Sequence, residues 1–574
     1  MCGIFCTLSR HGFIGPLDST TQLLQNRGPD SLGQHQVVVE AGSREDAEAS
    51  PRIHATFLST VLSLRGKAIV EQPLRDASTG SILCWNGECW SMGAMAYITG
   101  NDSEPVLAQL LRASSKATSP EAAVVATMNL LATCRGPHAF VFYDARHKLV
   151  YYGRDCLGRR SLLQKTTLHG LVLSSVCDNA SGDSWTEVDA DGIYIVHLDA
   201  FASDGPSSLP RHVPRRLSSQ ADETKVSLTL PFPALNRSIK SFSPPDGDTA
   251  AALKRSLLDA LRLRTFNVRE AVSLTPSNNV AQPAKIAVLF SGGLDCTILA
   301  RLCHDLLPIT NSIDLLNVAF ENPRIHSHLG ADTSPYELCP DRITGRSSFA
   351  ELQRVCPGRR WQFVAINVPY KDTKCHRTHV MTLMHPHNTE MDLSISYALY
   401  FASKGTGVIN EGDHIAPTAY TTTARVLLSG LGADELFGGY QRHATAYERK
   451  GYAGLIDELE LDFNRLGKRN LGRDDRVISD SGREVRFPFL DEDFISLALQ
   501  LSAKTKCDFG SPQVEDSKNP ALFLEPAKRA LRVLAWKLDL KQVAGEKKRA
   551  IQFGARTAKM ETGKTKGTHV LASV

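Results

Sequence analysis

The sequence contains no apolar run of about 18 residues, the length that a helix needs to cross a bilayer, so no membrane span is expected. Its N-terminus also lacks the basic and then apolar segments of a secretory signal. None of the 13 cysteines forms a CxxC pair, and their spacing is not that of a small disulfide-rich domain. These absences favour a cytoplasmic protein with reduced thiols.

A strong charge of either sign is also missing. Lys and Arg number 65 against 61 for Asp and Glu, which gives a formal net charge of +4. This excess is too small to predict binding to nucleic acid or to a membrane surface. The chain has 574 residues, 42% of them hydrophobic, so it is long enough to bury sizeable cores in two large domains or in several smaller ones.

Short segments rich in aliphatic and aromatic residues characterise the N-terminal part. We expect them to be strands, with turns at Asn86-Gly87, Asp144 and Gly153 between them. Layered β-sheets with a few helices would follow from such a pattern. The clearest strands are predicted at residues 82–85, 139–143 and 149–152.

A stretch rich in proline, serine and arginine follows, from residue 203 to residue 248. Proline removes a backbone donor and fixes φ, so this stretch is predicted to join no sheet. We therefore place the boundary between two domains here and predict a linker at residues 206–248.

The pattern beyond the linker is typical of an α/β domain. Leucines at helical spacing predict a helix over residues 249–266, with Asp248 as its N-cap. A continuous apolar segment bounded by proline and glycine predicts a buried parallel strand that leads into a second helix. The strands of this sheet are predicted at residues 286–290, 315–320 and 425–428. The tail at residues 557–574 has no amphipathic pattern and is predicted to be frayed.

Cys2 is a candidate nucleophile. Removal of Met1, which a small second residue permits, would make Cys2 the first residue. Its own α-amine, with an ordinary pKa of about 8, would then be placed to accept the proton of its thiol. Taken alone, the residue is better interpreted as a small buried hydrophobe.

A series of short motifs after Cys2 favours the catalytic interpretation. The series runs Cys2-Gly3-Ile4-Phe5, Asn26-Arg27-Gly28-Pro29-Asp30, Arg65, Asn86-Gly87-Glu88, Gly100-Asn101-Asp102, Arg135-Gly136-Pro137 and Gly153-Arg154-Asp155-Cys156-Leu157-Gly158. As an ordered set it resembles the class II glutamine amidotransferase domain. The resemblance implies an α+β N-terminal nucleophile hydrolase sandwich, with layered antiparallel sheets and helices, over residues 2–205.

The same resemblance assigns roles to individual residues. Cys2 would attack the side-chain amide carbon of glutamine, while the side chain of Asn86 and the backbone N–H of Gly87 would form the oxyanion hole. Charged side chains would hold the rest of the substrate, with Arg65 on its α-carboxylate and Glu88 and Asp102 on its α-ammonium group.

A glycine loop directly follows the first predicted strand of the α/β domain. Phe290-Ser291-Gly292-Gly293-Leu294-Asp295-Cys296 also opens a helix, and a helix N-terminus offers free N–H groups to an anion. Two glycines alone would equally suit an ordinary turn. The full string resembles the SGGxDS pyrophosphate loop of enzymes that cleave ATP to AMP and pyrophosphate. The resemblance implies that Phe290, Ser291, Gly292, Gly293, Asp295 and Cys296 contact ATP, with Asp295 also on Mg²⁺ and Cys296 in the usual place of serine.

A second string lies further along the chain. It is Ser429-Gly430-Leu431-Gly432-Ala433-Asp434-Glu435-Leu436-Phe437-Gly438-Gly439-Tyr440, and it resembles the SGxGxDExFxGY signature of asparagine and β-lactam synthetases. By this resemblance Ser429 and Gly430 would touch the nucleotide, and Asp434 would join Asp295 on the metal. Val318 matches the position that contacts adenine.

The two resemblances occur in the order found in asparagine synthetases. The chain is therefore identified as a member of that family, in its asparagine synthetase domain-containing branch. This implies an adenine-nucleotide α-hydrolase-like synthetase domain with a mostly parallel sheet at residues 249–556. It also implies a ligase of asparagine biosynthesis that uses glutamine, ATP, Mg²⁺ and an acceptor carboxylate, most simply aspartate, to form asparagine, AMP and pyrophosphate. The oligomeric state is left open.

Two departures from the family pattern concern the acceptor chemistry. Leu431 occupies the place of a glutamate that handles protons when ammonia attacks, and leucine cannot do so. Ala550 occupies the place of a lysine, which Lys548 or Arg549 would replace by a change of register unless they are merely solvated charges. These departures leave open a different acceptor, or a regulatory protein that binds glutamine or nucleotide without turnover. The histidines of His385-Pro386-His387 are predicted to lie at the surface without a metal.

Overall fold

The computed structural model describes residues 2–40, 51–168, 170–178, 184–204, 210–220, 226–239, 248–269, 283–330, 332–410, 416–511, 514, 519, 523–560 and 566–571. Met1, whose removal the small second residue permits, lies outside these ranges. Among the helices that they contain, none combines the length and the apolar character required to span a membrane.

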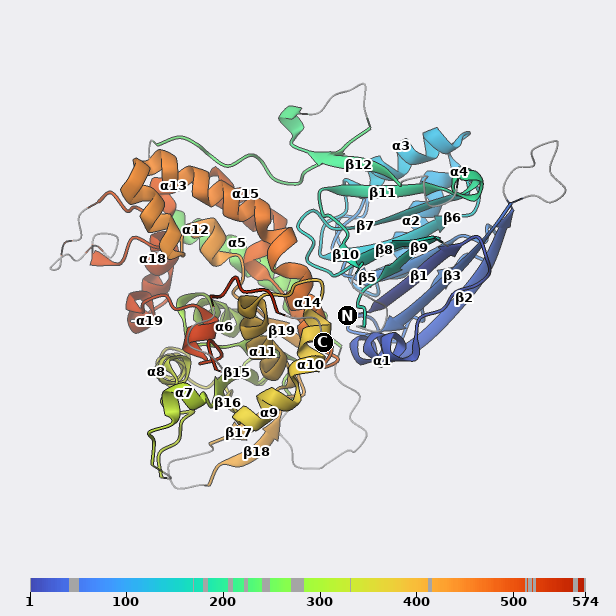
Figure 1. Cartoon of the computed structure of the whole chain (residues 1–574). Helices are drawn as coiled ribbons and strands as arrows, with labels where there is room; N and C mark the ends of the chain where they lie inside the picture. The colour runs from blue at the N-terminus through green and yellow to red at the C-terminus, as the bar shows by residue number, and fades with distance from the viewer. Residues whose placement is uncertain are drawn as a thin grey trace.

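Two sheets form the N-terminal part (Figure 1). The first has the order β10-β8-β9-β1-β3-β2 and the second the order β13-β12-β11-β7-β6-β5-β4. All neighbouring strands pair antiparallel except β12 and β13. The first sheet consists of β1 (Gly3–Ser9), β2 (Ser31–Glu40), β3 (Arg52–Val61), β8 (Leu163–Thr167), β9 (Gly170–Ser174) and β10 (Thr186–Glu187). The second consists of β4 (Leu74–Arg75), β5 (Ile82–Gly87), β6 (His138–Asp144), β7 (Leu149–Arg154), β11 (Gly192–His197), β12 (Arg211–Arg216) and β13 (Leu228–Thr229).

The two sheets share one hydrophobic core. Alternate side chains of β1 and β3, such as Ile4 and Phe57, pack in one buried cluster with Cys84 and Val141 of the second sheet. The opposite face of the second sheet is covered by α2 (Ser103–Ser115) and α3 (Pro120–Leu131). The helix α1 (Asp18–Arg27) packs on the other face of the first sheet. Since side chains alternate along a strand, each sheet buries both faces.

The predicted N-terminal strands are confirmed as β5, β6 and β7, but two predicted turns are wrong. Asn86 and Gly87 continue β5 and pair with Ala139 and His138 of β6. A Cβ atom at Gly87 would lie 2.1 Å from the carbonyl oxygen of Pro137, so glycine serves a close approach of two strands here. Gly153 likewise lies inside β7.

The prediction that residues 203–248 join no sheet is also wrong. Within this stretch β12 pairs with β11 and β13 pairs with β12. Val213 and Leu228 are buried in the core under α2 and α3, so their burial outweighs the loss of a ladder donor at Pro214. The backbone N–H of Arg215 also donates to the carbonyl oxygen of Asp191, at 2.6 Å.

The third sheet is mostly parallel, as predicted, and its order is β18-β17-β16-β15-β14-β19-β20. From β16 to β20 the parallel strands are the third, second, first, fourth and fifth along the chain, so the order reverses between β14 and β19. Ligands of open α/β sheets bind beyond the carboxyl ends of the strands at such a reversal. The strands are β14 (Ile286–Leu289), β15 (Ile313–Phe320), β16 (Trp361–Val368), β17 (Thr406–Ile409), β18 (Thr418–Thr421), β19 (Val426–Leu428) and β20 (Glu484–Arg486).

Helices surround this sheet (Figure 1). The predicted helix α5 and its N-cap are confirmed, because the Asp248 carboxylate accepts hydrogen bonds from two N–H groups of the first turn at 3.1 Å. The helices of this part are α5 (Thr249–Thr265), α6 (Leu294–Leu306), α7 (Pro323–His326), α8 (Pro340–Val355), α9 (Tyr370–Cys375), α10 (Arg377–Met384), α11 (Glu390–Lys404), α12 (Ala433–Phe437), α13 (Gln441–Arg469), α14 (Leu471–Ser479), α15 (Glu492–Gln500), α16 (Ala503–Lys506), α18 (Arg529–Lys537), α19 (Lys541–Gly545) and α20 (Ile551–Gly554), with a 3₁₀ turn at Pro488–Leu490. In the N-terminal part, α4 (Leu198–Asp204) packs against β3 and β11, and a 3₁₀ turn lies at Ser218–Gln220.

The C-terminal tail was predicted to be frayed, and this is wrong for its described residues. The carbonyl oxygens of His569 and Gly567 accept hydrogen bonds, both of 2.9 Å, from the N–H groups of Glu390 and Met391. These donors belong to the first turn of α11, where a helix has no partners of its own. Residues 561–565 and 572–574 of the predicted tail lie outside the description.

Candidate active sites

Cys2 lies at the start of β1, a strand that pairs on both sides, with β3 and β9. Its backbone nitrogen, which would become the α-amine once Met1 is removed, donates to Asn86 Oδ1 at 3.0 Å. Its Sγ atom lies 3.9 Å from Nε2 of Gln72. Burial raises the pKa of the Cys2 thiol, so the sulfur requires a nearby proton acceptor before it can act as a nucleophile.

The side-chain amide of Asn86 lies beside Cys2, and its two polar atoms differ in their contacts. Oδ1 is occupied by the Cys2 nitrogen, whereas Nδ2 is buried and has no hydrogen-bond partner within the described residues. An unsatisfied buried donor is costly to a fold, and one beside a nucleophile suits an oxyanion. Gln72 is held next to these residues, because its Oε1 accepts from the backbone N–H of Trp85, the residue before Asn86, at 2.8 Å.

The three residues predicted to hold glutamine come together, but two of them pair with each other. Arg65 Nη1 donates to Glu88 Oε2 at 2.9 Å and to the carbonyl oxygen of Cys89 at 3.3 Å. Asp102 Oδ2 accepts from Trp85 Nε1 at 3.0 Å and from the N–H of Cys89 at 2.7 Å. Burial, followed by the charge of Glu88, raises the pKa of Asp102 to about 7.

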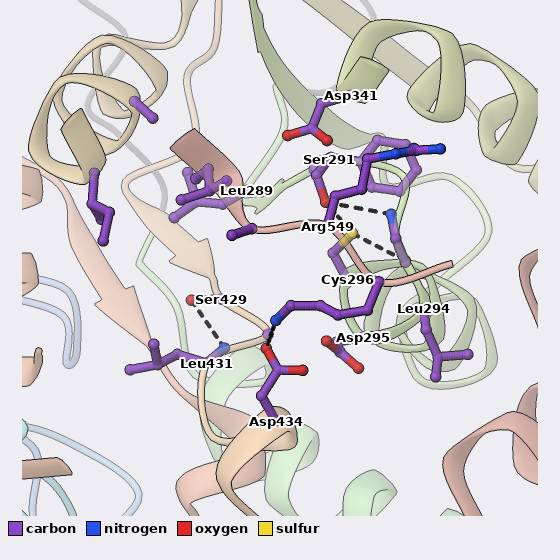
Figure 2. Close-up of a pocket in the computed structure, with 18 of the residues that line it drawn as sticks. Leu289, Ser291, Leu294, Asp295, Cys296, Asp341, Ser429, Leu431, Asp434 and Arg549 are labelled. Atoms are coloured by element: carbon purple, nitrogen blue, oxygen red, sulfur yellow. Dashed lines mark hydrogen bonds and ion pairs between the residues drawn. The ribbon is translucent and has the colours of Figure 1, made fainter. Parts of the chain in front are cut away.

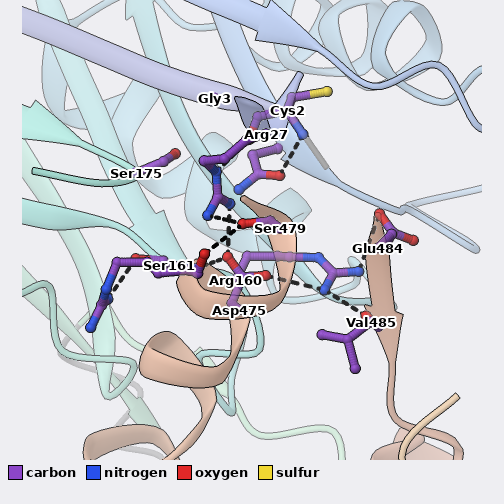
Figure 3. A network of polar contacts seen from close by, with 12 residues as sticks. Cys2, Gly3, Arg27, Arg160, Ser161, Ser175, Asp475, Ser479, Glu484 and Val485 are labelled. Carbon is purple, nitrogen blue, oxygen red and sulfur yellow. Dashed lines mark hydrogen bonds and ion pairs between the residues drawn. The ribbon is translucent and has the colours of Figure 1, made fainter. Parts of the chain in front are cut away.

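A buried polar network joins Cys2 to the C-terminal part of the chain (Figure 3). Arg27 lies at its centre, where Nε donates to the Cys2 carbonyl oxygen at 3.4 Å and Nη2 donates to Asp475 at 2.8 Å. Asp475 of α14 also accepts from Arg160 at 3.4 Å, and Arg160 pairs with Glu484 of β20 at 3.4 Å. The backbone of the candidate nucleophile is thus held by Arg27, which is itself paired with a carboxylate of the C-terminal part.

Arg486 of β20 connects the two candidate sites most directly. Its Nη2 donates to Glu88 Oε1 at 2.6 Å, and its Nε donates to Glu484 Oε1 at 2.6 Å. Its carbonyl oxygen accepts from the N–H of Ser429, at 3.0 Å, in the loop predicted to bind nucleotide. Glu88 therefore lies between two guanidinium groups, Arg65 and Arg486, and all three side chains are buried.

We expect Arg486→Gln to lower the free energy of unfolding by about 3–5 kcal/mol, because it leaves the carboxylates of Glu88 and Glu484 buried without this partner. Urea unfolding of the full chain measures the effect. The matched control is Arg237→Gln, which removes exposed ion pairs with Asp457 and Glu460 and is expected to change little. Equal stability of the two variants would contradict the conclusion that Arg486 neutralises these two buried carboxylates.

The second candidate site is a cavity of about 300 Å³ at the reversal of the third sheet (Figure 2). Two loops form it, one from β14 to α6 and one from β19 to α12. Gly292 does not line the cavity; its φ is 81°, and a Cβ there would lie 2.5 Å from the Gly345 backbone. Of the residues predicted to bind ATP or metal, those that line the cavity are Phe290, Ser291, Gly293, Asp295, Cys296, Val318, Ser429, Gly430 and Asp434.

Cys296, which takes the usual place of serine, bonds within its own loop. Its Sγ donates to the carbonyl oxygen of Gly293 at 3.3 Å and lies 3.7 Å from the Ser291 hydroxyl oxygen. Burial raises the pKa of this thiol, so the neutral S–H form is favoured. A neutral thiol remains a weak donor at the loop.

Lys528, which the sequence analysis missed, lies between the two candidate metal ligands. Its Nζ is 2.7 Å from Asp295 Oδ2 and 2.9 Å from Asp434 Oδ1. Burial acts to raise the pKa of Asp434, but the Lys528 and Lys548 ammonium groups lower it overall. Burial acts to lower the pKa of Lys528, and the two carboxylates raise it overall. No motif of the sequence surrounds Lys528 that would have indicated this position.

The two carboxylates of Asp295 and Asp434 suit a metal ion that binds together with phosphate. Among the described residues no three His, Cys, Asp or Glu side chains gather as a metal site, but Asp295 and Asp434 lie next to each other (Figure 2). Mg²⁺ bound to a nucleotide characteristically takes one or two carboxylates and completes its shell with phosphate and water. Asp295 and Asp434 therefore suit Mg²⁺ in company with a nucleotide.

We expect Lys528→Met to lower the free energy of unfolding by up to about 3 kcal/mol, because two partly buried carboxylates lose their shared, buried ammonium group. Millimolar Mg²⁺ is expected to recover part of this loss, while the wild type responds less. Thermal unfolding with and without Mg²⁺ measures both effects. As a control, Lys537→Met removes an exposed ion pair with Asp248. No Mg²⁺ response in the Lys528 variant would contradict the metal assignment.

The residues that depart from the family pattern also line this cavity. Leu431 and Ala550 both face it, and neither can exchange a proton. Lys548 contacts Asp434, and Arg549 Nη1 donates to Thr344 Oγ1 at 2.9 Å. Lys548 is therefore not merely a solvated charge, while Arg549 is 42% exposed but also lines the cavity.

The prediction of surface histidines is wrong for His387. Its side chain is 16% exposed and lies 3.8 Å from Glu187 and 4.0 Å from Asp392, on the two parts of the chain. Burial lowers its pKa to about 4. The neutral imidazole of His387 therefore packs between charged side chains and is largely shielded from solvent.

Comparison with known proteins identifies the family of the chain. The family model "Asparagine synthase" matches residues 414–457 and 447–535, which include the loop after β19 and Lys528. Asparagine synthetase domain-containing protein 1 of Gallus gallus is 32% identical over 99% of this chain and 99% of its own length. The protein of the same name in Homo sapiens is 31% identical over 98% of this chain and 96% of its own. The chain belongs to the asparagine synthetase domain-containing family.

More distant relatives cover less of the chain. A putative glutamine-hydrolysing asparagine synthetase of Methanocaldococcus jannaschii is 36% identical over 24% of this chain and 28% of its own length. A solved glutamine phosphoribosylpyrophosphate amidotransferase from B. subtilis aligns at 14% identity and a TM-score of 0.27, over 64% of this chain and 91% of that one. A superposition as loose as this supports no conclusion.

Proposed function

We propose that the protein is an amide-forming ligase of the asparagine synthetase type, driven by glutamine and ATP. Residues 2–205 would form the glutamine amidotransferase domain, an N-terminal nucleophile hydrolase, and residues 249–556 an adenine-nucleotide α-hydrolase-like synthetase domain. The observation that carries the proposal is Arg486, whose guanidinium binds Glu88 of the candidate glutamine site and whose carbonyl oxygen accepts from the N–H of Ser429 in the candidate nucleotide loop. One residue thus touches both candidate sites.

In the first half-reaction the Cys2 thiol would attack the amide carbon of glutamine. The free α-amine, held by Asn86 Oδ1, would accept the thiol proton and return it to the leaving ammonia. The unpartnered Nδ2 of Asn86, with the N–H of Gly87, would stabilise the tetrahedral oxyanion. Water would then release glutamate from the thioester.

Glutamine binding requires an exchange of ion pairs. The α-carboxylate of the substrate would take Arg65 from Glu88, and the α-ammonium group would take Glu88 and Asp102. Arg486 keeps Glu88 in place while this exchange occurs. Substrate binding would therefore be transmitted to β20 and to the neighbouring nucleotide loop.

In the second half-reaction the loops after β14 and β19 would hold ATP. The N–H groups that begin α6 would face the phosphates, and Lys528, Lys548 and Arg549 would offset their charge. Mg²⁺, held by Asp295 and Asp434, would neutralise charge on the leaving pyrophosphate. An acceptor carboxylate would attack the α-phosphorus, and ammonia would then displace AMP to give an amide.

Aspartate is the simplest acceptor, and the product would then be asparagine. Leu431 cannot accept the proton that the attacking ammonia must lose, which costs about 10²- to 10⁴-fold where a general base is removed. Neutral ammonia delivered from the first site is itself a nucleophile, so amide formation would continue at a lower rate.

A second candidate is the same chemistry with a different acceptor carboxylate. The observation that favours it is the apolar wall of the cavity, to which Leu431, Ile395, Ala398, Leu399 and Ala402 contribute. Apolar surface in a binding pocket favours a substrate with apolar groups to bury. Such an acceptor would be less polar than aspartate.

Two assays on the full chain separate these functions. Glutamate release tests the first site, and ATP–pyrophosphate exchange across a panel of carboxylates tests the second. Exchange with aspartate supports the first candidate, and exchange only with less polar carboxylates supports the second. If the protein shows no glutamate release and no exchange with any carboxylate, it is a protein that binds glutamine or nucleotide without turnover.

Asp102 predicts the pH dependence of glutamine binding. Its carboxylate form is needed for the substrate's ammonium group, and its pKa in the free protein is about 7. The KM for glutamine is therefore expected to rise as the pH falls, by about tenfold per unit below 7. Steady-state glutamate release from about pH 5.5 to 8.5 measures it. The Asp102→Asn variant should bind more weakly and lose this dependence; the wild-type dependence in that variant would contradict the assignment.

A further inference from the structure

Two thiols and an imidazole that the proposed reaction does not use lie behind the glutamine site. The Sγ atoms of Cys89 and Cys134 are 3.5 Å apart, and Cys134 Sγ is 3.7 Å from Nδ1 of His138. Cys89 follows β5, and His138 begins β6. An isolated bridge between Ser91 and Arg135 holds the two segments side by side.

Cys134 and His138 border a small cavity of about 20 Å³, which the side chains of Asp155, Cys156, Arg215 and Glu492 also line. A volume of this size admits a molecule of about the size of water. Hydrogen peroxide is larger by one oxygen atom. Cys134 therefore faces a space of about the size of one water molecule, and hydrogen peroxide can enter it once the side chains that line it move apart.

The surroundings of Cys134 favour its thiolate. A hydrogen bond with Cys89, opposed by burial and assisted by His138, lowers the pKa of the Cys134 thiol. The same hydrogen bond, with burial, raises the pKa of Cys89. Two other buried thiols differ: burial raises the pKa of Cys84 to about 12 and that of Cys156 to about 12. One sulfur of the pair is thus a nucleophile and the other a proton donor.

We propose that Cys89 and Cys134 form a reversible disulfide when hydrogen peroxide enters this cavity. The Cys134 thiol first gives its proton to His138, 3.7 Å away, and the resulting thiolate attacks one oxygen of the peroxide. The O–O bond breaks, and the leaving hydroxide takes the proton back from His138 to become water. Cys134 is then a sulfenic acid. The Cys89 thiol attacks its sulfur, the S–O bond breaks and a second water leaves. Two thiols and one peroxide thus give one disulfide and two waters, and a thiol reductant reverses the reaction.

Oxidation would alter the glutamine site, and this step rests on the proposed function. A disulfide brings the sulfurs from 3.5 Å to about 2.05 Å, so the Cys89 segment must move toward Cys134. The N–H of Cys89 donates to Asp102, and its carbonyl oxygen accepts from Arg65. Since a misplacement of about 1 Å can cost about 10²-fold in rate, glutamate release is expected to fall by at least about tenfold on oxidation.

The chemical claim is tested by peptide mapping of the full chain after treatment with hydrogen peroxide and alkylation of free thiols. A Cys89–Cys134 disulfide is expected in the wild type and in Cys156→Ser, but not in Cys134→Ser. The exposed Cys375 serves as the internal reference for thiol reactivity. Oxidation of Cys375 with no Cys89–Cys134 disulfide, or a Cys134–Cys156 disulfide in its place, would overturn the proposal.

Glutamate release before oxidation, after oxidation and after added dithiothreitol tests the consequence. Loss and recovery in the wild type, with no loss in Cys134→Ser, is the expected result. A disulfide that forms without changing glutamate release would overturn the regulatory claim. If the reduced protein releases no glutamate at all, the proposed function fails, and the mapped disulfide still decides whether the modification occurs.

Discussion

Replacement of Cys2 by alanine is expected to lower glutamine hydrolysis by at least about 10⁴-fold, since removing a nucleophile leaves only the weak catalysis of the remaining site. The thiol of this residue lies beside the Gln72 amide directly before β1, its backbone nitrogen donates to Asn86 Oδ1, and the buried Nδ2 of Asn86 has no partner among the described residues. Alanine is as small as cysteine, so removal of Met1 is unaffected. Glutamate release from purified protein, followed with an enzyme-coupled assay, measures the loss.

The matched control is Cys6→Ala in the same strand. Cys6 is buried in the core between the two sheets rather than beside Asn86. This variant is expected to lose some stability and to keep glutamate release. Nucleotide turnover with added ammonia should survive in Cys2→Ala, because the second site remains intact. Equal glutamate release from Cys2→Ala and wild type would show that Cys2 is not the nucleophile.

The second large effect is expected for Asp434→Asn, which should lower ATP–pyrophosphate exchange by about 10³-fold. A metal contributes several kcal/mol of charge stabilisation to phosphoryl chemistry, and about 1.4 kcal/mol corresponds to tenfold in rate. Asparagine keeps the size of the side chain but gives up the charge that Lys528 and Lys548 balance. Exchange of radiolabelled pyrophosphate into ATP, with saturating acceptor, measures the effect.

Glu435→Gln in the same short helix provides the control. Glu435 accepts a hydrogen bond from the Tyr440 hydroxyl at 2.6 Å and is absent from the residues that line the nucleotide cavity. A glutamine there can still accept this bond, so exchange should change little. Glutamate release should be retained in both variants. A loss of exchange in Glu435→Gln as large as in Asp434→Asn would indicate a general disturbance of α12 rather than a metal ligand.

The cavity that forms the candidate nucleotide site was largely predictable because its parts are local in sequence. Asp295 and Asp434 each follow an apolar strand and a glycine loop, and residues after adjacent parallel strands meet at one edge of a sheet. The continuous apolar segment at β14 indicated such a strand. Lys528 could not be predicted in the same way, because tertiary packing alone brings it between the two carboxylates.

The residues of the candidate glutamine site were proposed from sequence motifs, but their partners were not. Gln72 carries no local signal, and the family-like stretch that begins at Arg486 did not indicate its contact with Glu88, since both contacts depend on a fold that brings distant segments together. The errors at β12 and in the tail share a cause. Proline content and weak periodicity are properties of a segment by itself. Val213 is instead positioned by a hydrophobic core that other segments form, and Gly567 is positioned by free N–H groups of α11.

Transfer of nitrogen between the two sites is the central claim, and glutamine labelled with ¹⁵N in its amide tests it most directly. Full-length protein is incubated with the labelled glutamine, ATP, Mg²⁺ and an acceptor that supports exchange, in the presence of unlabelled ammonium. The account predicts glutamate, AMP and pyrophosphate in equal amounts, with ¹⁵N retained in the amide product. Glutamate formed without AMP, or a product amide whose nitrogen comes only from the unlabelled ammonium, would contradict it.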